Sequence, residues 1–145
     1  MRAISLWQPW ASLWMTDHKL HETRHWHTSY RGMLYVHAAK RPIGKLDLSP
    51  ELEDLCVKEW GKDFRVCLPF GAIIGIVKLI ECSETQTVGT TEIDKVCGDW
   101  TPGRYAWLRA SQPTYIGPWP YKGRQGFFNV NDLDEVANRE LDIHV

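Results

Sequence analysis

The sequence predicts an α+β fold, a small mixed β-barrel with helices packed around it. Short runs rich in β-branched and aromatic residues recur at irregular spacing, which is typical of strands. Two or three helical segments lie between these runs without regular alternation, which disfavours a doubly wound parallel sheet. A length of 145 residues, with no repeats or linkers, suits one domain spanning 1–145.

The chain begins with segments typical of a short strand at 2–6 and a helix at 9–16. Proline suits the first position of that helix, because its missing N–H is not needed there. Trp10, Leu13 and Trp14 then follow at i, i+3 and i+4, which indicates an amphipathic helix.

Residues 19–28 are predicted to be extended, with a turn at 29–32 and an apolar strand at 33–38. Side chains alternate between the two faces of a strand. Four residues of unusual chemistry therefore share one face, namely Glu22, Arg24, Trp26 and Thr28. The opposite face carries His21, Thr23, His25 and His27.

The second half of the chain is expected to complete the sheet. Ser49-Pro50-Glu51 is typical of a helix start, and Gly61 of its end. The remaining segments are a central strand at 71–82, one or two helical turns at 91–96, a strand at 104–110, a proline-broken connection at 113–121, a turn at 122–126, a strand at 127–130 and a helix from 131.

Composition limits the classes of protein to consider. The net charge of −1 gives no overall basic field, so any polyanion must be met by a local patch. The four cysteines form no C-x-x-C motif. No signal-like or membrane-spanning apolar run is present, so we expect a cytoplasmic protein with reduced thiols and no membrane contact.

The charged face of segment 19–28 is the first candidate site. Burying unpaired charges is costly, so Glu22 and Arg24 are expected to line a cleft or to meet a ligand. The candidate catalytic residues are Lys19, Glu22 and Arg24. Lys19 would act as a base or an acid, and Glu22 would orient a ribose hydroxyl. Arg24 would bind a phosphate and stabilise its developing charge. The alternative is that Glu22 and Arg24 form a structural ion pair.

The segment also contains His21-Glu22-Thr23-Arg24-His25, which matches the zinc motif H-E-x-x-H. That motif needs a helix, whereas extended geometry separates His21 and His25 by about 13 Å. We therefore expect neither a metal site nor a cofactor.

Several motifs, taken in order, resemble one family. They are Ile4-Ser5-Leu6-x-Gln8-Pro9-Trp10-Ala11-Ser12-Leu13, Lys19-x-x-Glu22-x-Arg24-x-Trp26-x-Thr28-x-x-Arg31-Gly32-x-Leu34, residues 71–79, Pro102-Gly103-Arg104-Tyr105-Ala106-Trp107 and Lys122-Gly123-x-Gln125-Gly126-Phe127. The chain resembles the ASCH domain family from residue 2 to about 130, with residues 131–145 as a C-terminal helical extension. The resemblance implies a PUA-like β-barrel whose cleft presents Lys19, Glu22 and Arg24 to a ligand.

The resemblance also implies a role with RNA, by binding or by processing. Some members of the family look like ribonucleases. A smaller branch removes the acetyl group of N4-acetylcytidine and carries Lys-x-x-Thr where this chain has Lys19-x-x-Glu22. A carboxylate does not replace a hydroxyl nucleophile, so this departure weighs against acyl transfer.

Other residues are candidates for nucleic-acid binding. Gln8 and Trp10 have the chemistry to read and stack on a base, although Trp10 also fits a helix core. Lys122, Arg124 and Gln125 lie in a glycine-flanked turn suited to phosphate. The full set adds Trp26, Thr28, Arg31 and Lys40.

The sequence thus predicts a protein that binds RNA or a nucleotide, with metal-independent cleavage of single-stranded RNA as its possible chemistry. The alternatives are an amidohydrolase acting on a modified nucleoside such as N4-acetylcytidine, and an RNA-binding module without turnover. The oligomeric state stays open.

Overall fold

The computed structural model describes residues 1–143 of the chain. Their strands are β1 (Arg2–Leu6), β2 (His21–Arg24), β3 (Gly32–Ala38), β4 (Ala72–Glu84), β5 (Tyr105–Arg109), β6 (Thr114–Pro120) and β7 (Phe127–Asn129). Their helices are α1 (Trp10–Leu13), α2 (Pro50–Trp60), α3 (Phe64–Cys67), α4 (Glu92–Val96) and α5 (Asp134–Ile143), with a 3-10 turn at Thr85–Thr87. This mixed architecture confirms the α+β class.

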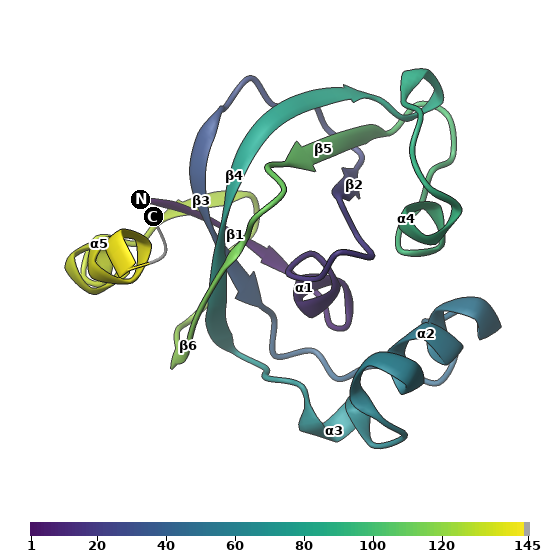
Figure 1. Ribbon diagram of the computed structural model, residues 1–145, viewed down its shortest axis with the longest axis horizontal. Helices are drawn as coiled ribbons and strands as arrows, with labels where there is room; N and C mark the ends of the chain where they lie inside the picture. The colour runs from purple at the N-terminus through teal and green to yellow at the C-terminus, as the bar shows by residue number, and fades with distance from the viewer. Residues whose placement is uncertain (144–145) are drawn as a thin grey trace.

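The seven strands of the described residues form one mixed sheet in the order β2-β5-β4-β3-β1-β7, with β6 paired to β4. β4 is the central strand, as predicted, and has antiparallel partners along both edges. β1 runs parallel to β3, and β7 returns antiparallel to β1. The long β4 bends strongly, so the sheet curls around α1 (Figure 1).

The expectation of a closed barrel is wrong. β2 and β7 end the strand order and are not hydrogen-bonded to each other. Aromatic rings pack against one another near these edges. Trp26 lies edge-on to Trp107 at 4.7 Å and to Phe127 at 5.3 Å between ring centroids. Side-chain contacts therefore take the place of the ladder that would close a barrel.

The prediction of an irregular connection at 113–121 is also wrong, because β6 forms there. β6 pairs with residues 72–76 of β4, with an irregularity between Ile73 and Gly75. It lies at an edge of the sheet, where the missing N–H groups of Pro118 and Pro120 are tolerated.

Local signals explain α2. The Ser49 hydroxyl accepts a hydrogen bond from the Leu52 N–H at 3.2 Å, Pro50 occupies the first turn, and Gly61 ends the helix with φ of 91°. α1 is shorter than the predicted 9–16, because the turn after Leu13 is already irregular. The buried Arg109 donates to the carbonyl of Trp14 there, at 2.7 Å.

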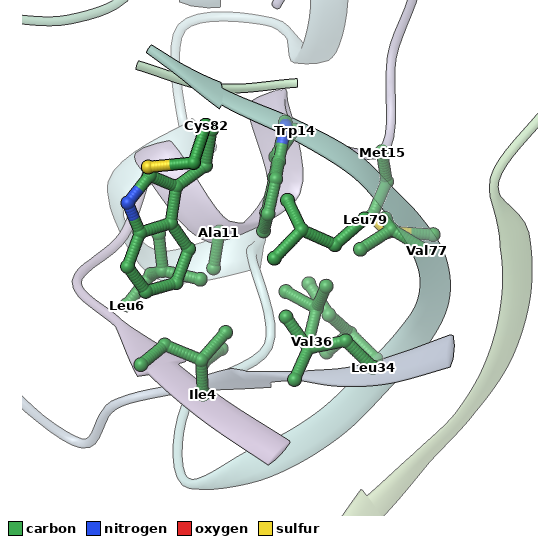
Figure 2. Packing of buried hydrophobic residues seen from close by; sticks show 13 residues of the cluster. Ile4, Leu6, Ala11, Trp14, Met15, Leu34, Val36, Val77, Leu79 and Cys82 are labelled. Atoms are coloured by element: carbon green, nitrogen blue, oxygen red, sulfur yellow. The ribbon is translucent and has the colours of Figure 1, made fainter. Parts of the chain in front are cut away.

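The main core fills the inside of the curl. Ile4, Leu6, Leu34, Val36 and Leu79 from the sheet meet Ala11, Trp14 and Met15 from α1 and the residues after it (Figure 2). A second cluster lies under α5, and a third lies between α2, α3 and the rest of the fold. The sheet and α1 thus form a rigid frame for the loops at its rim.

The C-terminal helix predicted from 131 begins at Asp134, and residues 144–145 of the predicted extension lie outside the described residues. None of the helices in residues 1–143 has the length and apolar character needed to span a membrane.

Candidate functional site

A cleft of about 1590 Å³ opens at one rim of the sheet. Its walls come from segments far apart in sequence. They are the end of β1, β2 with the residues that follow it, the loop after β3, residues 96–104 and the loop between β6 and β7. This volume exceeds the roughly 300–1,000 Å³ of a small-molecule pocket, so the cleft has room for a segment of a polymeric ligand as well as for a single nucleotide.

β2 delivers Glu22 and Arg24 to this cleft. Glu22 Oε2 lies 3.3 Å from Arg24 Nη1, and Glu22 Oε1 lies 3.2 Å from Lys19 Nζ. The side chain of Glu22 is 9 % exposed and that of Arg24 is 21 % exposed. The carboxylate is held between two cations, one on each oxygen. The guanidinium keeps a buried Nε without a partner among the described residues.

Lys19 does not line the cleft, contrary to what the sequence suggests. It is fully buried, and its Nζ donates to the carbonyl of Cys97 at 2.7 Å as well as facing Glu22. The position of Lys19 suits it to hold Glu22 in place rather than to reach a ligand.

The cleft is lined by five lysine or arginine side chains and three carboxylates, Glu22, Asp47 and Asp99. Each carboxylate already has a cation nearby. Asp47 is paired with Arg41 at 2.7 Å, and Asp99 lies 3.6 Å from Arg104. Lys40, Lys122 and Arg124 are exposed and form no ion pair with the side chains of residues 1–141. The cleft therefore presents an unbalanced positive rim.

Residues 121–126 form the basic loop of this rim. Within the described chain, no backbone N–H of 122–126 donates a hydrogen bond to the protein. The loop thus offers free N–H donors beside the cations of Lys122 and Arg124, a combination suited to an anion. Gln125 also lines the cleft.

His37 anchors the basic loop. Its Nε2 donates to the carbonyl of Tyr121 at 2.7 Å, so its Nδ1 accepts from the Ser5 hydroxyl at 2.8 Å. Burial lowers the pKa of His37, and the bond to the Tyr121 carbonyl opposes this shift only in part. The imidazole is therefore neutral near pH 7, with its proton on Nε2.

Gly123 must be small for the loop to sit against His37. A Cβ at this position would lie 2.6 Å from His37 Cε1 and 3.1 Å from Ser5 Oγ. We expect Gly123→Ala to lower the free energy of unfolding by about 1–3 kcal/mol through overpacking, measured by urea denaturation. Gly89→Ala is the matched control, because nothing lies within 4 Å of its Cβ position. Equal stability of the two variants would contradict this account of the loop.

Three tryptophans line the cleft, and two of them were predicted site residues. Trp26 is half-buried against Trp107, and Trp10 packs against the core cluster under α2. The third, Trp7, is 54 % exposed and carries Arg41 over its ring at 4.0 Å.

Three other predicted binding residues lie outside the cleft. Gln8 is fully buried, and its Nε2 donates to Ser12 Oγ at 2.7 Å and to the carbonyl of Pro69 at 2.8 Å. Thr28 is buried and accepts from the Tyr30 N–H, while Arg31 donates to the Thr28 carbonyl. These residues shape the polypeptide next to the cleft, and Gln8 has no free amide to read a base.

The histidines of the H-E-x-x-H segment do not gather. β2 is extended, as predicted, and His21 is buried, with its Nδ1 2.7 Å from Asp94 Oδ2. His25 lines the cleft instead. In the part of the chain that the structure describes, no three histidine, cysteine or acidic side chains come close enough to hold a metal ion.

The comparison with known families agrees with the motifs that surround this cleft. Residues 4–125 match the ASCH domain. The chain belongs to the ASCH domain family. Its β1, β2, central strand and basic loop all fall inside the matched range or at its end.

The ASCH domain is also similar to part of two curated proteins. Activating signal cointegrator 1 of Homo sapiens and that of Mus musculus are each 37 % identical to it over 81 residues. The match covers 54 % of this chain and 14 % of either relative. The similarity is therefore to a small portion of those proteins.

Sequence reasoning missed several residues of this ASCH domain's cleft, namely Ser5, Trp7, His37, Asp47 and Arg104. Ser5 and His37 lie on adjacent parallel strands, in register with each other. No local pattern signals this pairing, because it depends on how β1 and β3 pair. Trp7 lies between β1 and α1, and no local pattern predicts its exposure or its contact with Arg41.

Proposed function

We propose that this ASCH domain binds single-stranded RNA or a nucleotide in the cleft. The observation that carries the proposal is the convergence of Lys40, Lys122 and Arg124 on one rim, although the whole chain is nearly neutral. Phosphates supply most of the affinity in such complexes, and cations with free N–H groups are their usual partners. The general association of the ASCH family with RNA supports the same proposal.

Removing two of the rim cations tests the proposal. We expect the double variant Lys122→Ala/Arg124→Ala to bind a labelled single-stranded oligonucleotide about tenfold more weakly, measured by fluorescence anisotropy. The slope of log affinity against log salt should decrease in magnitude by about 1.4, because each phosphate contact with a single strand contributes about 0.7 and two are removed.

The matched control removes two lysines outside the cleft. Lys58 and Lys62 are exposed at the end of α2 and just beyond it, so Lys58→Ala/Lys62→Ala changes the net charge equally. The same loss of affinity in both double variants would mean that only net charge matters, and the cleft would then not be the binding site.

Cleavage of RNA is the chemistry that the Glu22–Arg24 pair favours. Glu22 would accept the proton of a ribose 2′-hydroxyl while the 2′-oxygen attacks the adjacent phosphorus. The bond from phosphorus to the 5′-oxygen then breaks, which leaves a 2′,3′-cyclic phosphate, and the departing 5′-oxygen takes a proton from water. Arg24, whose Nε has no partner among the described residues, would stabilise the charge on the phosphate. Lys19 is fully buried and would hold the carboxylate without touching the substrate.

An assay in EDTA tests this chemistry. We expect wild type to cleave labelled single-stranded RNA and to leave the corresponding DNA intact, since DNA lacks the attacking hydroxyl. Glu22→Gln keeps the shape of the side chain and should slow cleavage by about 100-fold or more. Glu51→Gln, on the exposed start of α2, should cleave like wild type. Equal rates for Glu22→Gln and wild type would identify a contaminating nuclease and remove the catalytic role.

A binding module without turnover is the remaining outcome. Salt-dependent binding without any cleavage product would select it. Hydrolysis of N4-acetylcytidine is less favoured, because position 22 carries a carboxylate and the hydroxyl of Thr23 accepts from the Asp99 N–H. Release of acetate from that nucleoside, followed by chromatography, would reverse this preference.

A further inference from the structure

We infer that the indole of Trp7 is a stacking platform for an unpaired base of the bound RNA. This inference rests on the proposed function and adds a base subsite to the phosphate-binding rim. Trp7 is 54 % exposed and lines the cleft. The large hydrophobic side chains with greater exposure among the described residues, Leu46, Val66 and Tyr115, lie outside it.

Two contacts restrain Trp7 before any ligand binds. Its carbonyl accepts from the Ala11 N–H at 3.0 Å, which ties the backbone to the first turn of α1. The Arg41 guanidinium lies over one face of the ring, 4.0 Å from its centroid. An indole held in this way loses little conformational entropy when a base stacks on it.

Arg41 is itself held in place. Its Nη1 and Nη2 donate to the two oxygens of Asp47 at 2.7 and 3.2 Å. The Gly44 N–H donates to the same carboxylate at 2.7 Å. The bond from Arg41, together with that from Gly44, lowers the pKa of Asp47, so the carboxylate stays ionised at neutral pH. The charge of Arg41 is thus balanced within this cluster.

The occupant that fits is a base rather than another apolar group. Arg41 lies over one face of the ring, yet the side chain is still 54 % exposed and lines the cleft, so indole surface stays available to a flat ring. Lys40, one residue from Arg41, places an exposed cation on the same cleft, as a partner for the phosphate of a stacked nucleotide. A paired base is stacked on its neighbours already, so the platform selects single strands or flipped-out bases.

The test separates bases from phosphates. Two fluorescein-labelled probes of about ten units are compared by anisotropy. One is oligoadenylate, and the other is a ribose-phosphate chain of equal charge that lacks the bases. Trp7→Ala should weaken binding of oligoadenylate by about tenfold, in line with the loss of one stacked base. The abasic probe should bind both proteins equally, and Trp7→Tyr should keep most of the affinity for oligoadenylate.

Tyr115→Ala removes another exposed aromatic ring, which lies outside the cleft, and should leave both affinities unchanged. Unchanged binding of oligoadenylate by Trp7→Ala would overturn the inference, even if the rim binds phosphate as proposed. Equal losses with both probes would also overturn it, because Trp7 would then act on the fold and not on the base. Failure of wild type to bind either probe would refute the proposed function itself.

Discussion

Replacement of Asp94 by alanine should destabilise the fold by about 3–5 kcal/mol, the cost of removing one partner from a buried pair. Asp94 lies in α4, is fully buried, and connects this helix to the start of β2 through its carboxylate. Its carboxylate accepts from the backbone N–H groups of Leu20 and His21, from His21 Nδ1 and from the Thr90 hydroxyl. The alanine variant leaves these four donors without an acceptor next to the strand that carries Glu22 and Arg24.

The contribution of Asp94 should also depend on pH. Burial alone would raise the pKa of this carboxyl, but the hydrogen bonds from His21, Thr90 and the two backbone N–H groups outweigh burial and lower it. A depressed pKa in the folded state stabilises the protein above the unfolded pKa of about 3.9, and the stabilisation is lost as the pH falls through the folded value.

Urea denaturation between about pH 7 and pH 3 measures both effects. The free energy of unfolding of wild type should fall as the pH is lowered through the acid range. That of Asp94→Asn should fall less steeply, because its side chain has no proton to gain. Glu92→Gln, on the exposed side of α4, is the control and should follow the wild-type curve closely. A cost below about 1 kcal/mol for Asp94→Ala would contradict the assignment of Asp94 as the anchor of β2.

The second large effect concerns Lys19. We expect Lys19→Met to lower the free energy of unfolding by about 3–5 kcal/mol, because it leaves the nearly buried Glu22 with Arg24 alone and the Cys97 carbonyl without its donor. Methionine has a similar length, so loss of packing contributes little. Urea denaturation at pH 7 gives the value.

The double variant Lys19→Met/Glu22→Gln distinguishes charge from packing. Removing the Glu22 charge as well should restore part of the stability lost in Lys19→Met, since the uncompensated carboxylate is gone. Strictly additive losses would mean that Lys19 and Glu22 do not act as a pair, and Lys19 would then need a role other than positioning the carboxylate.

Local signals account for the parts of the fold that the sequence predicts well. The capping serine and Pro50 mark α2, and the Ile- and Val-rich run marks β4 as the central strand. β6 was missed because its prolines suggest a break, whereas an edge strand has one side that needs no N–H donors. Closure of the sheet was wrongly expected because it depends on whether β2 and β7 meet, which no local pattern determines.

The positions of site residues, too, were predicted correctly where a local pattern marks them and wrongly where their placement depends on distant contacts. The sequence predicts Glu22, Arg24 and Trp26 correctly as residues of the cleft. They occupy every second position of an extended segment, so they share one face, and that face is too polar for the core. Gln8 and Lys19 have the same kind of polar chemistry but are buried by contacts with Pro69 and Cys97, which lie far away in sequence. Trp7 was missed because its exposure and its contact with Arg41 follow from the tertiary fold.

The most direct test of the central claim is a structure of this ASCH domain with a short single-stranded RNA bound. The account predicts a phosphate within hydrogen-bonding distance of Lys122, Arg124 or the backbone N–H groups of the basic loop, with the strand running through the cleft past Glu22 and Arg24. RNA bound on α2 or α5, with the cleft free of nucleotide, would contradict it.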